Sequence, residues 1–173
     1  MMTIIWKVFN NLSFIKKHGL FLTPSSTVNI IKYLTLPRRK KVSYQPIQIS
    51  FYITDKCTLN CNFCPHHSPD RNKHYPFLHN SLQDMKFETF RRIIDTFPEA
   101  IRITLTGVGE PFLNVNIFKM IDYAISSRKL ITVISNGTLL KDSLDELAKR
   151  MIYSLSVSLN VESQIEYYKL TNS

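Results

Sequence analysis

The sequence predicts an α/β protein built on a parallel β-sheet. Four short segments rich in apolar and β-branched residues alternate with longer segments whose apolar residues recur at helical spacing. Short turns join them, so consecutive strands are connected through helices, which gives parallel strands with right-handed crossovers. A length of 173 residues with 44% apolar residues suits one domain with a substantial core.

Residues 1–46 are expected to form a short helical extension, and residues 47–173 the α/β domain itself. One helix of the extension is predicted over Ile4–Lys17, and a second is predicted to end at about Leu34. Hydroxyl side chains able to cap the start of the second helix are Ser25, Ser26 and Thr27. We expect the extension to pack against the α/β domain.

The α/β domain begins with a strand followed by all three cysteines of the chain. Apolar and polar residues alternate from Ile47 to Ile53, which is typical of a strand. The cysteines come directly after its carboxyl end. Ligands of parallel α/β sheets bind at this edge, because strand ends and helix starts converge there.

Three more strands are predicted, at Ala100–Thr106, Leu130–Ser135 and Tyr153–Leu159. Helices are predicted at Met85–Phe97, Ile117–Ile125, Leu144–Met151 and Val161–Ser173. Residues suited to cap the first three are Asp84, then Asn114 or Asn116, then Asp142 or Ser143. The segment Pro65–Gln83 has no clear period, so it is either a substrate-facing lid or an irregular connection.

Cys57, Cys61 and Cys64 have the spacing Cys-x3-Cys-x2-Cys, which indicates a metal centre. An odd number of thiols cannot pair off, and neighbours on so short a loop would form strained disulfides. Iron-sulfur clusters usually take four cysteines, so three would leave one iron open to an exchangeable ligand. Two alternatives are a zinc site completed by His66 or His67, and cysteines with a merely structural role.

The cysteine spacing, with Phe63 just before the third cysteine, resembles the signature of the radical S-adenosylmethionine (radical SAM) superfamily. The resemblance implies that the cysteines hold a [4Fe–4S] cluster whose fourth iron is chelated by S-adenosylmethionine (SAM). Reductive cleavage of SAM would then give a 5'-deoxyadenosyl radical that abstracts hydrogen from a substrate. Phe63 would lie near the adenine; alternatively, it is a packing residue.

A glycine-rich turn follows the second predicted strand. Gly107 and Gly109 free the backbone to approach a ligand, and Glu110 brings a carboxylate to the same edge as the cysteines. The turn is similar to the Gly-Gly-Glu motif that radical SAM enzymes set against the methionyl amino group of SAM, here with Val108 between the glycines. The alternative is an ordinary strand-to-helix turn with an exposed glutamate.

Further matches follow the third and fourth strands. The resemblance implies that Ser135 and Asn136 approach the ribose or carboxylate of SAM, whereas the alternative is an ordinary Asn-Gly turn. Ser158 and Asn160 stand in the register of the family's Ser-x-Asp element. The amide of Asn160 can hydrogen-bond the ribose but supplies no charge. No side chain is assigned the role of a catalytic acid, base or nucleophile.

The resemblance also implies a partial TIM-type (βα)n barrel, with about four of its six βα units present, so that the core domain is incomplete at its carboxyl end. The Cys-Pro-His-His run and the basic amino-terminal part are similar to radical SAM proteins that carry a SPASM-type domain and often modify peptides. A reductant protein such as flavodoxin or ferredoxin is the implied partner. The other hypotheses are a non-catalytic zinc-binding module and an inactive truncated fragment.

The formal net charge is +9, part of it in the basic run at 38–41. Such a run is usually a solvated face, and no aromatic-rich basic stripe accompanies it, so we do not expect nucleic acid as a partner. The apolar start of the chain is interrupted by lysines, so no membrane span is predicted. Closely set thiols suit a reducing cytoplasm, where we expect the protein to lie.

Overall fold

The computed structural model describes residues 23–35, 44–78 and 83–172 of the chain. Its strands form one parallel sheet in the order β1-β2-β3-β4. The strands are β1 (Gln48–Tyr52), β2 (Arg102–Thr106), β3 (Leu130–Ser135) and β4 (Ser154–Val157). The predicted α/β class with parallel strands is therefore confirmed, and each predicted strand is present with ends within two residues of those expected.

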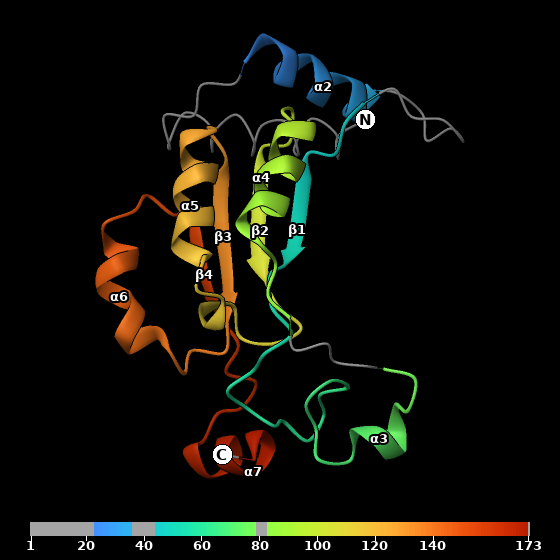
Figure 1. Cartoon of the computed structure of the whole chain (residues 1–173), viewed down its shortest axis with the longest axis vertical. Coiled ribbons are helices and arrows are strands. Elements are labelled where there is room, and N and C mark those ends of the chain that lie inside the picture. Colours follow the sequence, from blue (N-terminus) through green and yellow to red (C-terminus); the bar gives the residue numbers. More distant parts are fainter. Residues whose placement is uncertain (1–22, 36–43, 79–82, 173) are drawn as a thin grey trace.

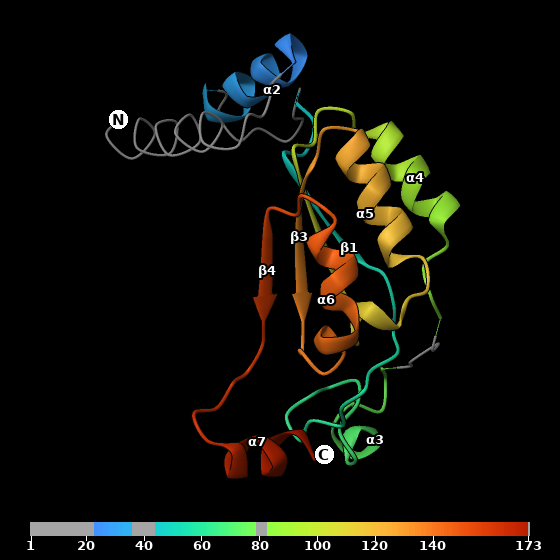
Figure 2. The same cartoon turned by 90° about the vertical axis from the view of Figure 1, so that its left-hand side faces the viewer.

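Three helices cover one face of the sheet (Figures 1 and 2). They are α4 (Phe87–Thr96), α5 (Ile117–Ser126) and α6 (Leu140–Ala148). Apolar side chains of these helices and of the facing strand positions form the core, whose fully buried members include Phe90, Ile103, Leu105, Met120, Ile131 and Val133. Burial of this apolar surface is the main force that holds the helices on the sheet.

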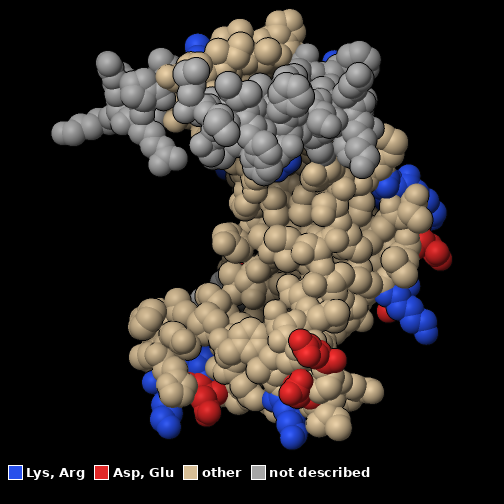
Figure 3. All heavy atoms as spheres, turned by 180° about the vertical axis from the view of Figure 1, so that it is seen from behind, with Lys and Arg blue, Asp and Glu red and all other residues tan. Residues whose placement is uncertain are grey.

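The opposite face of the sheet is not covered by these helices (Figure 2). Successive strand residues point to opposite faces, so the residues between the buried positions belong to this open face. The strand register places Ser50, Thr104, Thr132 and Ser154 in one row across it. Figure 3 views the molecule from this side, and the middle of the face is largely free of charged side chains.

Two predicted helix starts are wrong. The helix α2 (Pro24–Thr35) begins after Thr23, whose Oγ1 accepts a hydrogen bond from the Ser26 N–H at 3.1 Å, so the cap lies ahead of the three hydroxyl residues predicted. The helix α6 begins at Leu140, so the predicted caps Asp142 and Ser143 lie inside it. The helix predicted at Ile4–Lys17 lies outside the described residues.

Two short elements and one further helix lie toward the carboxyl ends of the strands (Figure 1). The segment predicted to be a lid or an irregular connection contains the one-turn helix α3 (Arg71–His74). A 3-10 turn, η1 (Pro111–Leu113), follows the glycine-rich turn. The last helix, α7 (Gln164–Thr171), starts from Ser163, whose Oγ accepts a hydrogen bond from the Glu166 N–H at 3.2 Å. The helix predicted for this part of the chain is therefore present.

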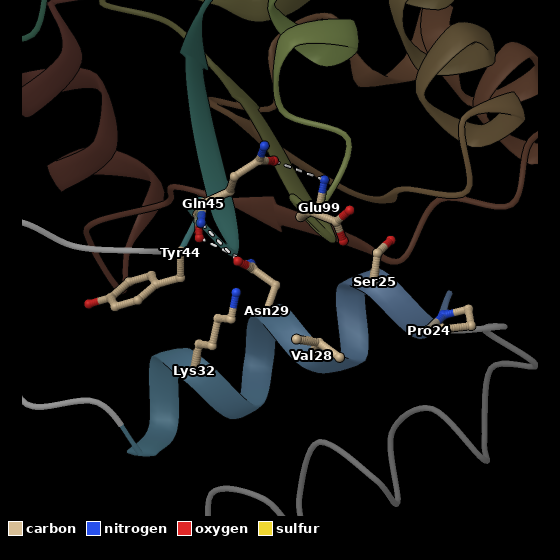
Figure 4. Close-up of a pocket in the computed structure, with 8 residues that line it drawn as sticks. All are labelled: Pro24, Ser25, Val28, Asn29, Lys32, Tyr44, Gln45 and Glu99. Carbon is tan, nitrogen blue, oxygen red and sulfur yellow. Dashed lines mark hydrogen bonds between the residues drawn. The ribbon is translucent and has the colours of Figure 1, made fainter.

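A groove of about 660 Å³ lies at the other, amino end of the sheet (Figure 4). There Asn29 of α2 accepts a hydrogen bond from the Gln45 N–H at 2.8 Å and donates one to the Gln45 carbonyl at 3.1 Å. This pair ties α2 to the segment leading into β1. Cysteine and histidine are absent from the described residues that line the groove, so it is not the metal site that the sequence predicts. Among the described helices, none reaches the length and apolarity that crossing a membrane requires.

Candidate functional site

The three cysteines lie on a loop, residues 55–64, that leaves the carboxyl end of β1; we call it the cysteine loop. Asp84 anchors its start, because its carboxylate accepts hydrogen bonds from the Thr54 hydroxyl at 2.7 Å and from the Lys56 ammonium at 2.9 Å. Burial raises the pKa of Asp84, but these two bonds outweigh it and hold the pKa below its ordinary value. Asp84 was predicted to cap α4, whose N-cap is instead Lys86.

Asn114 also holds the segment at the carboxyl end of β1 in place. Its side chain is fully buried, and its amide donates to the carbonyls of Ile53 at 2.6 Å and Met85 at 3.2 Å. It was predicted as a possible cap of α5, but it connects the end of β1 to the segment before α4. The N-cap position of α5 is Asn116, whose side chain makes no capping hydrogen bond.

The glycine-rich turn after β2 packs directly against the cysteine loop. The Gly109 N–H donates to the Thr54 carbonyl at 3.3 Å, and the Glu110 N–H donates to the Lys56 carbonyl at 2.7 Å. A Cβ atom on Gly109 would lie only 1.7 Å from the Lys56 carbonyl oxygen, so only glycine fits. The close backbone approach at Gly109 is therefore made by the cysteine loop itself. Gly107 is also tight, since a Cβ there would lie 2.7 Å from the Gly109 carbonyl oxygen.

The Glu110 carboxylate is fully buried and is fixed by three donors. Its Oε1 accepts from the Ser135 hydroxyl at 2.9 Å and from the Phe112 N–H at 3.2 Å, and its Oε2 accepts from the Asn136 N–H at 2.7 Å. The alternative of an exposed glutamate in an ordinary turn is therefore wrong. A carboxylate has about four acceptor positions, so it retains capacity for a further donor.

Ser135, the last residue of β3, and Asn136, which follows it, both bind Glu110, as expected from their place at the same edge of the sheet. Ser135 is buried, and its hydroxyl oxygen also accepts the Gly137 N–H at 2.9 Å. The Asn136 side chain reaches the cysteine loop, where its Nδ2 donates to Cys57 Sγ at 3.7 Å. The structure thus brings one cysteine, the glutamate and the end of β3 together.

Three further residues are predicted to contact SAM, namely Ser158, Asn160 and Phe63. The Ser158 N–H donates to the Ser135 carbonyl at 2.9 Å, which continues the β3–β4 pairing. Asn160 adopts the left-handed backbone conformation with φ of 61°, which asparagine tolerates better than most residues. The Phe63 side chain is 54% exposed, so it is not a core residue and is accessible to a ligand.

The three thiols are free and half-buried. Burial raises the pKa of Cys57, and the nearby Cys64 thiol and Glu110 carboxylate raise it further, against an opposing hydrogen bond from the Leu59 N–H. Burial also raises the pKa of Cys61, as do Cys57 and Cys64.

This arrangement fits a polynuclear cluster better than a single metal ion. In the described part of the chain, no three His, Cys, Asp or Glu side chains gather closely enough to hold one ion. This holds for the three cysteines alone and for the cysteines together with His66 or His67. In an iron-sulfur cluster each thiolate binds a different iron, so the sulfurs need not converge on one point. Three neighbouring thiols on one loop are a suitable donor set for such a cluster.

The far side of the cysteine loop is held by α7. The N–H groups of Asn60 and Asn62 donate to the carbonyls of Thr171 at 3.2 Å and Leu170 at 2.9 Å. The Asn62 side-chain amide donates to the Lys169 carbonyl at 2.8 Å. The last carbonyls of a helix lack partners within the helix, so the loop caps α7 while α7 orders the loop. No local pattern in the sequence singles out Asn62, because its partner Lys169 lies 107 residues away in the chain.

Substituting Asn62 by alanine is expected to loosen α7 locally. The lost hydrogen bond is worth about 1 kcal/mol, so the amides of α7 should exchange roughly fivefold faster, with little change in the core. Hydrogen exchange followed by mass spectrometry measures this. Asn60→Ala is the matched control, since Asn60 contacts α7 through its backbone. Equal protection of α7 in both variants would contradict the role of the Asn62 side chain in holding α7, a contact that we call the clamp.

Comparison with known proteins adds independent findings. Residues 51–172 match the family model described as the Radical SAM superfamily. The antilisterial bacteriocin subtilosin biosynthesis protein AlbA of Bacillus subtilis is 26% identical over 123 residues, which are 68% of this chain and 25% of that protein. A probable GTP 3',8-cyclase of Methanococcus maripaludis is 30% identical over 122 residues, which are 69% of this chain and 38% of that protein. The chain thus spans well under half the length of these relatives.

Solved structures share the fold at low sequence identity. Streptococcus suis SuiB bound to S-adenosylmethionine matches with a TM-score of 0.57 and 17% identity, over 96% of this chain and 32% of that chain. SuiB bound to the precursor peptide SuiA matches with a TM-score of 0.55 and 19% identity, over 96% of this chain and 31% of that chain. The four parallel strands and their helices therefore follow an architecture seen in experimental structures, consistent with part of a (βα) barrel.

Proposed function

The chain belongs to the radical SAM superfamily, whose enzymes use a [4Fe–4S] cluster and SAM, and from this we propose that Cys57, Cys61 and Cys64 bind that cluster. We propose that the protein acts in reductive cleavage of SAM and hydrogen abstraction from a substrate. The observation that carries the proposal is the packing of the cysteine loop against the turn that presents Glu110, joined by the bond from the Glu110 N–H to the Lys56 carbonyl at 2.7 Å.

Each part of the site would have a separate task. The bound cluster supplies an electron and SAM supplies the 5'-deoxyadenosyl radical, which protein side chains cannot provide. Glu110, held in place by three donors, would receive the methionyl amino group without having to reorganise. The exposed ring of Phe63 would pack on the adenine. Ser158 and Asn160 would lie along the ribose side of the cofactor.

We place the substrate over the open face of the sheet, and we propose a peptide. Among the strand residues of this face, which run from Gln48 to Ser156, one cation is present, Arg102. A row of hydroxyl groups suits the amide groups of a peptide, whereas a nucleoside triphosphate calls for several cations. AlbA, named for subtilosin biosynthesis, and SuiB bound to a precursor peptide support this choice over the GTP cyclases. A cytoplasmic reductant such as flavodoxin or ferredoxin would supply the electron.

The proposal is tested by anaerobic reconstitution with iron and sulfide, followed by electron paramagnetic resonance (EPR) of the reduced protein. We expect a cluster signal that shifts when SAM is added, because SAM binds the open iron. A colourless protein that binds one zinc tightly and takes up no cluster would overturn the proposal in favour of a zinc-binding module. A cluster whose EPR signal does not change when SAM is added would support the cysteines as ligands but contradict SAM cleavage.

Glu110→Gln is expected to weaken SAM binding to the reconstituted protein about 30-fold. The exchange removes a charge-assisted hydrogen bond worth about 2 kcal/mol. A glutamine amide would also face one of the three N–H or O–H donors that now bind the carboxylate. Calorimetric titration with SAM measures the change, with Glu88→Gln on the exposed surface of α4 as the matched control. Equal affinity in both variants would show that Glu110 does not receive the amino group.

A further inference from the structure

The amide of Asn136 has only one orientation that satisfies its neighbours. Its Oδ1 accepts from the Thr138 N–H at 3.0 Å and from the Thr138 hydroxyl at 2.8 Å. A backbone N–H can only donate, so the oxygen of the amide must face Thr138 and the NH₂ group must face the other way. The Asn136 backbone is fixed as well, since its N–H donates to Glu110 Oε2 at 2.7 Å.

Both protons of this NH₂ group are engaged on the cysteine loop. Nδ2 lies 3.0 Å from Thr58 Oγ1 and 3.7 Å from Cys57 Sγ. Cys57 Sγ also receives the Leu59 N–H at 3.5 Å. With two acceptor and two donor interactions the amide is saturated, so it could contact the ribose or carboxylate of SAM only by giving up one of these bonds.

A hydrogen bond to a cysteine ligand changes the redox behaviour of an iron-sulfur cluster. Reduction adds negative charge that is shared with the ligand sulfurs, and a donor at the sulfur stabilises this reduced form more than the oxidised form. Hydrogen bonds to the sulfurs are one of the determinants of cluster potential. The buried Glu110 carboxylate beside Asn136 acts in the opposite sense, because it disfavours added negative charge.

We propose that Asn136 serves the cluster rather than SAM: it raises the reduction potential by donating a hydrogen bond from its side-chain amide to Cys57 Sγ. This inference rests on the proposed function, since it requires that Cys57 binds a cluster. It replaces the contact with the ribose or carboxylate that the sequence suggested for Asn136. Thr138 and Thr58 are then positioning residues that hold the amide.

The test is an EPR-monitored redox titration of the reconstituted protein without SAM. Asn136→Leu, which lacks the donor, should shift the midpoint to a more negative potential by about a tenfold change in the one-electron equilibrium, roughly 59 mV. Asn136→Asp should shift it further, because it adds a negative charge beside the sulfur while retaining an oxygen for Thr138. Asn60→Leu makes the same exchange at an exposed side chain of the cysteine loop and should leave the midpoint unchanged.

A second readout uses the wild-type protein and so does not depend on the variants folding. With ¹⁵N in the asparagine side-chain amides, the reduced cluster should show a hyperfine coupling to one amide nitrogen, and its absence would overturn the inference. Unchanged midpoints in both Asn136 variants, with weaker SAM binding, would also overturn it and return Asn136 to the SAM site. Failure of the wild type to take up a cluster would instead defeat the proposed function.

Discussion

The triple substitution of Cys57, Cys61 and Cys64 by alanine is expected to reduce bound iron and sulfide to background after reconstitution. The cluster would lose all of its protein ligands, and the described residues offer no other group of ligating side chains nearby. The fold should persist, because the thiols are only half-buried and lie outside the hydrophobic core. Iron and sulfide analysis measures the first effect, and thermal unfolding of the iron-free protein should show a change of about 1 kcal/mol or less.

The control for this experiment is the double variant His66→Ala, His67→Ala. A cluster held by three cysteines should survive it with its iron content unchanged. A zinc site of the Cys3His type would lose its metal in both variants. Metal retained by the triple cysteine variant would contradict both kinds of site.

Gly109→Ala is expected to disable the site without altering any ligand. The new Cβ would lie 1.7 Å from the Lys56 carbonyl oxygen and 2.9 Å from the Cys57 nitrogen. These are backbone atoms, so no rotamer change can relieve the clash, and the cysteine loop must move. We expect a loss of about 3 kcal/mol in stability, at the upper end of overpacking effects, together with most of the cluster binding.

Unfolding by denaturant and iron analysis measure the two effects of Gly109→Ala. The neighbouring exchange Val108→Ala removes methyl groups from the same turn without introducing a clash, so it should retain the cluster. Wild-type stability and full iron content in Gly109→Ala would show that the turn and the cysteine loop are not in the contact described. Loss of the cluster in Val108→Ala with the cluster retained in Gly109→Ala would also contradict the contact between the turn and the cysteine loop.

The four strands, their parallel pairing and the edge that carries the site could be predicted from the sequence. Period-two alternation and helical spacing are local patterns, and the carboxyl ends of parallel strands meet at one edge whatever the details of packing. This geometry predicts that Glu110 lies at the same edge of the sheet as the cysteine loop. The hydrogen bond from the Glu110 N–H to the Lys56 carbonyl confirms it. The family signature at Cys57, Cys61 and Cys64 is confirmed by the family match, although their role as cluster ligands stays a prediction.

The residues that hold the site in place could not be predicted in this way. Asp84 and Asn114 were noticed as polar residues near helix starts, where a cap is the commonest role, but both instead bind the end of β1. Their partners are set by tertiary packing, which no local pattern reports. Asn136 was assigned to the cofactor through its position after β3, whereas its hydrogen bonds depend on a threonine two residues later and on a loop almost eighty residues earlier.

The clamp between Asn62 and α7 also affects how the protein is made. Asn62 and its partner Lys169 are separated by 107 residues in the chain. At a translation rate of about 5–20 residues per second, the cysteine loop leaves the ribosome roughly 5–20 s before the helix that orders it. Throughout that interval the three thiols are presented on a segment without its partner, open to oxidation or to the wrong metal. The loop that carries the three thiols therefore reaches its described arrangement only after α7 has been synthesised.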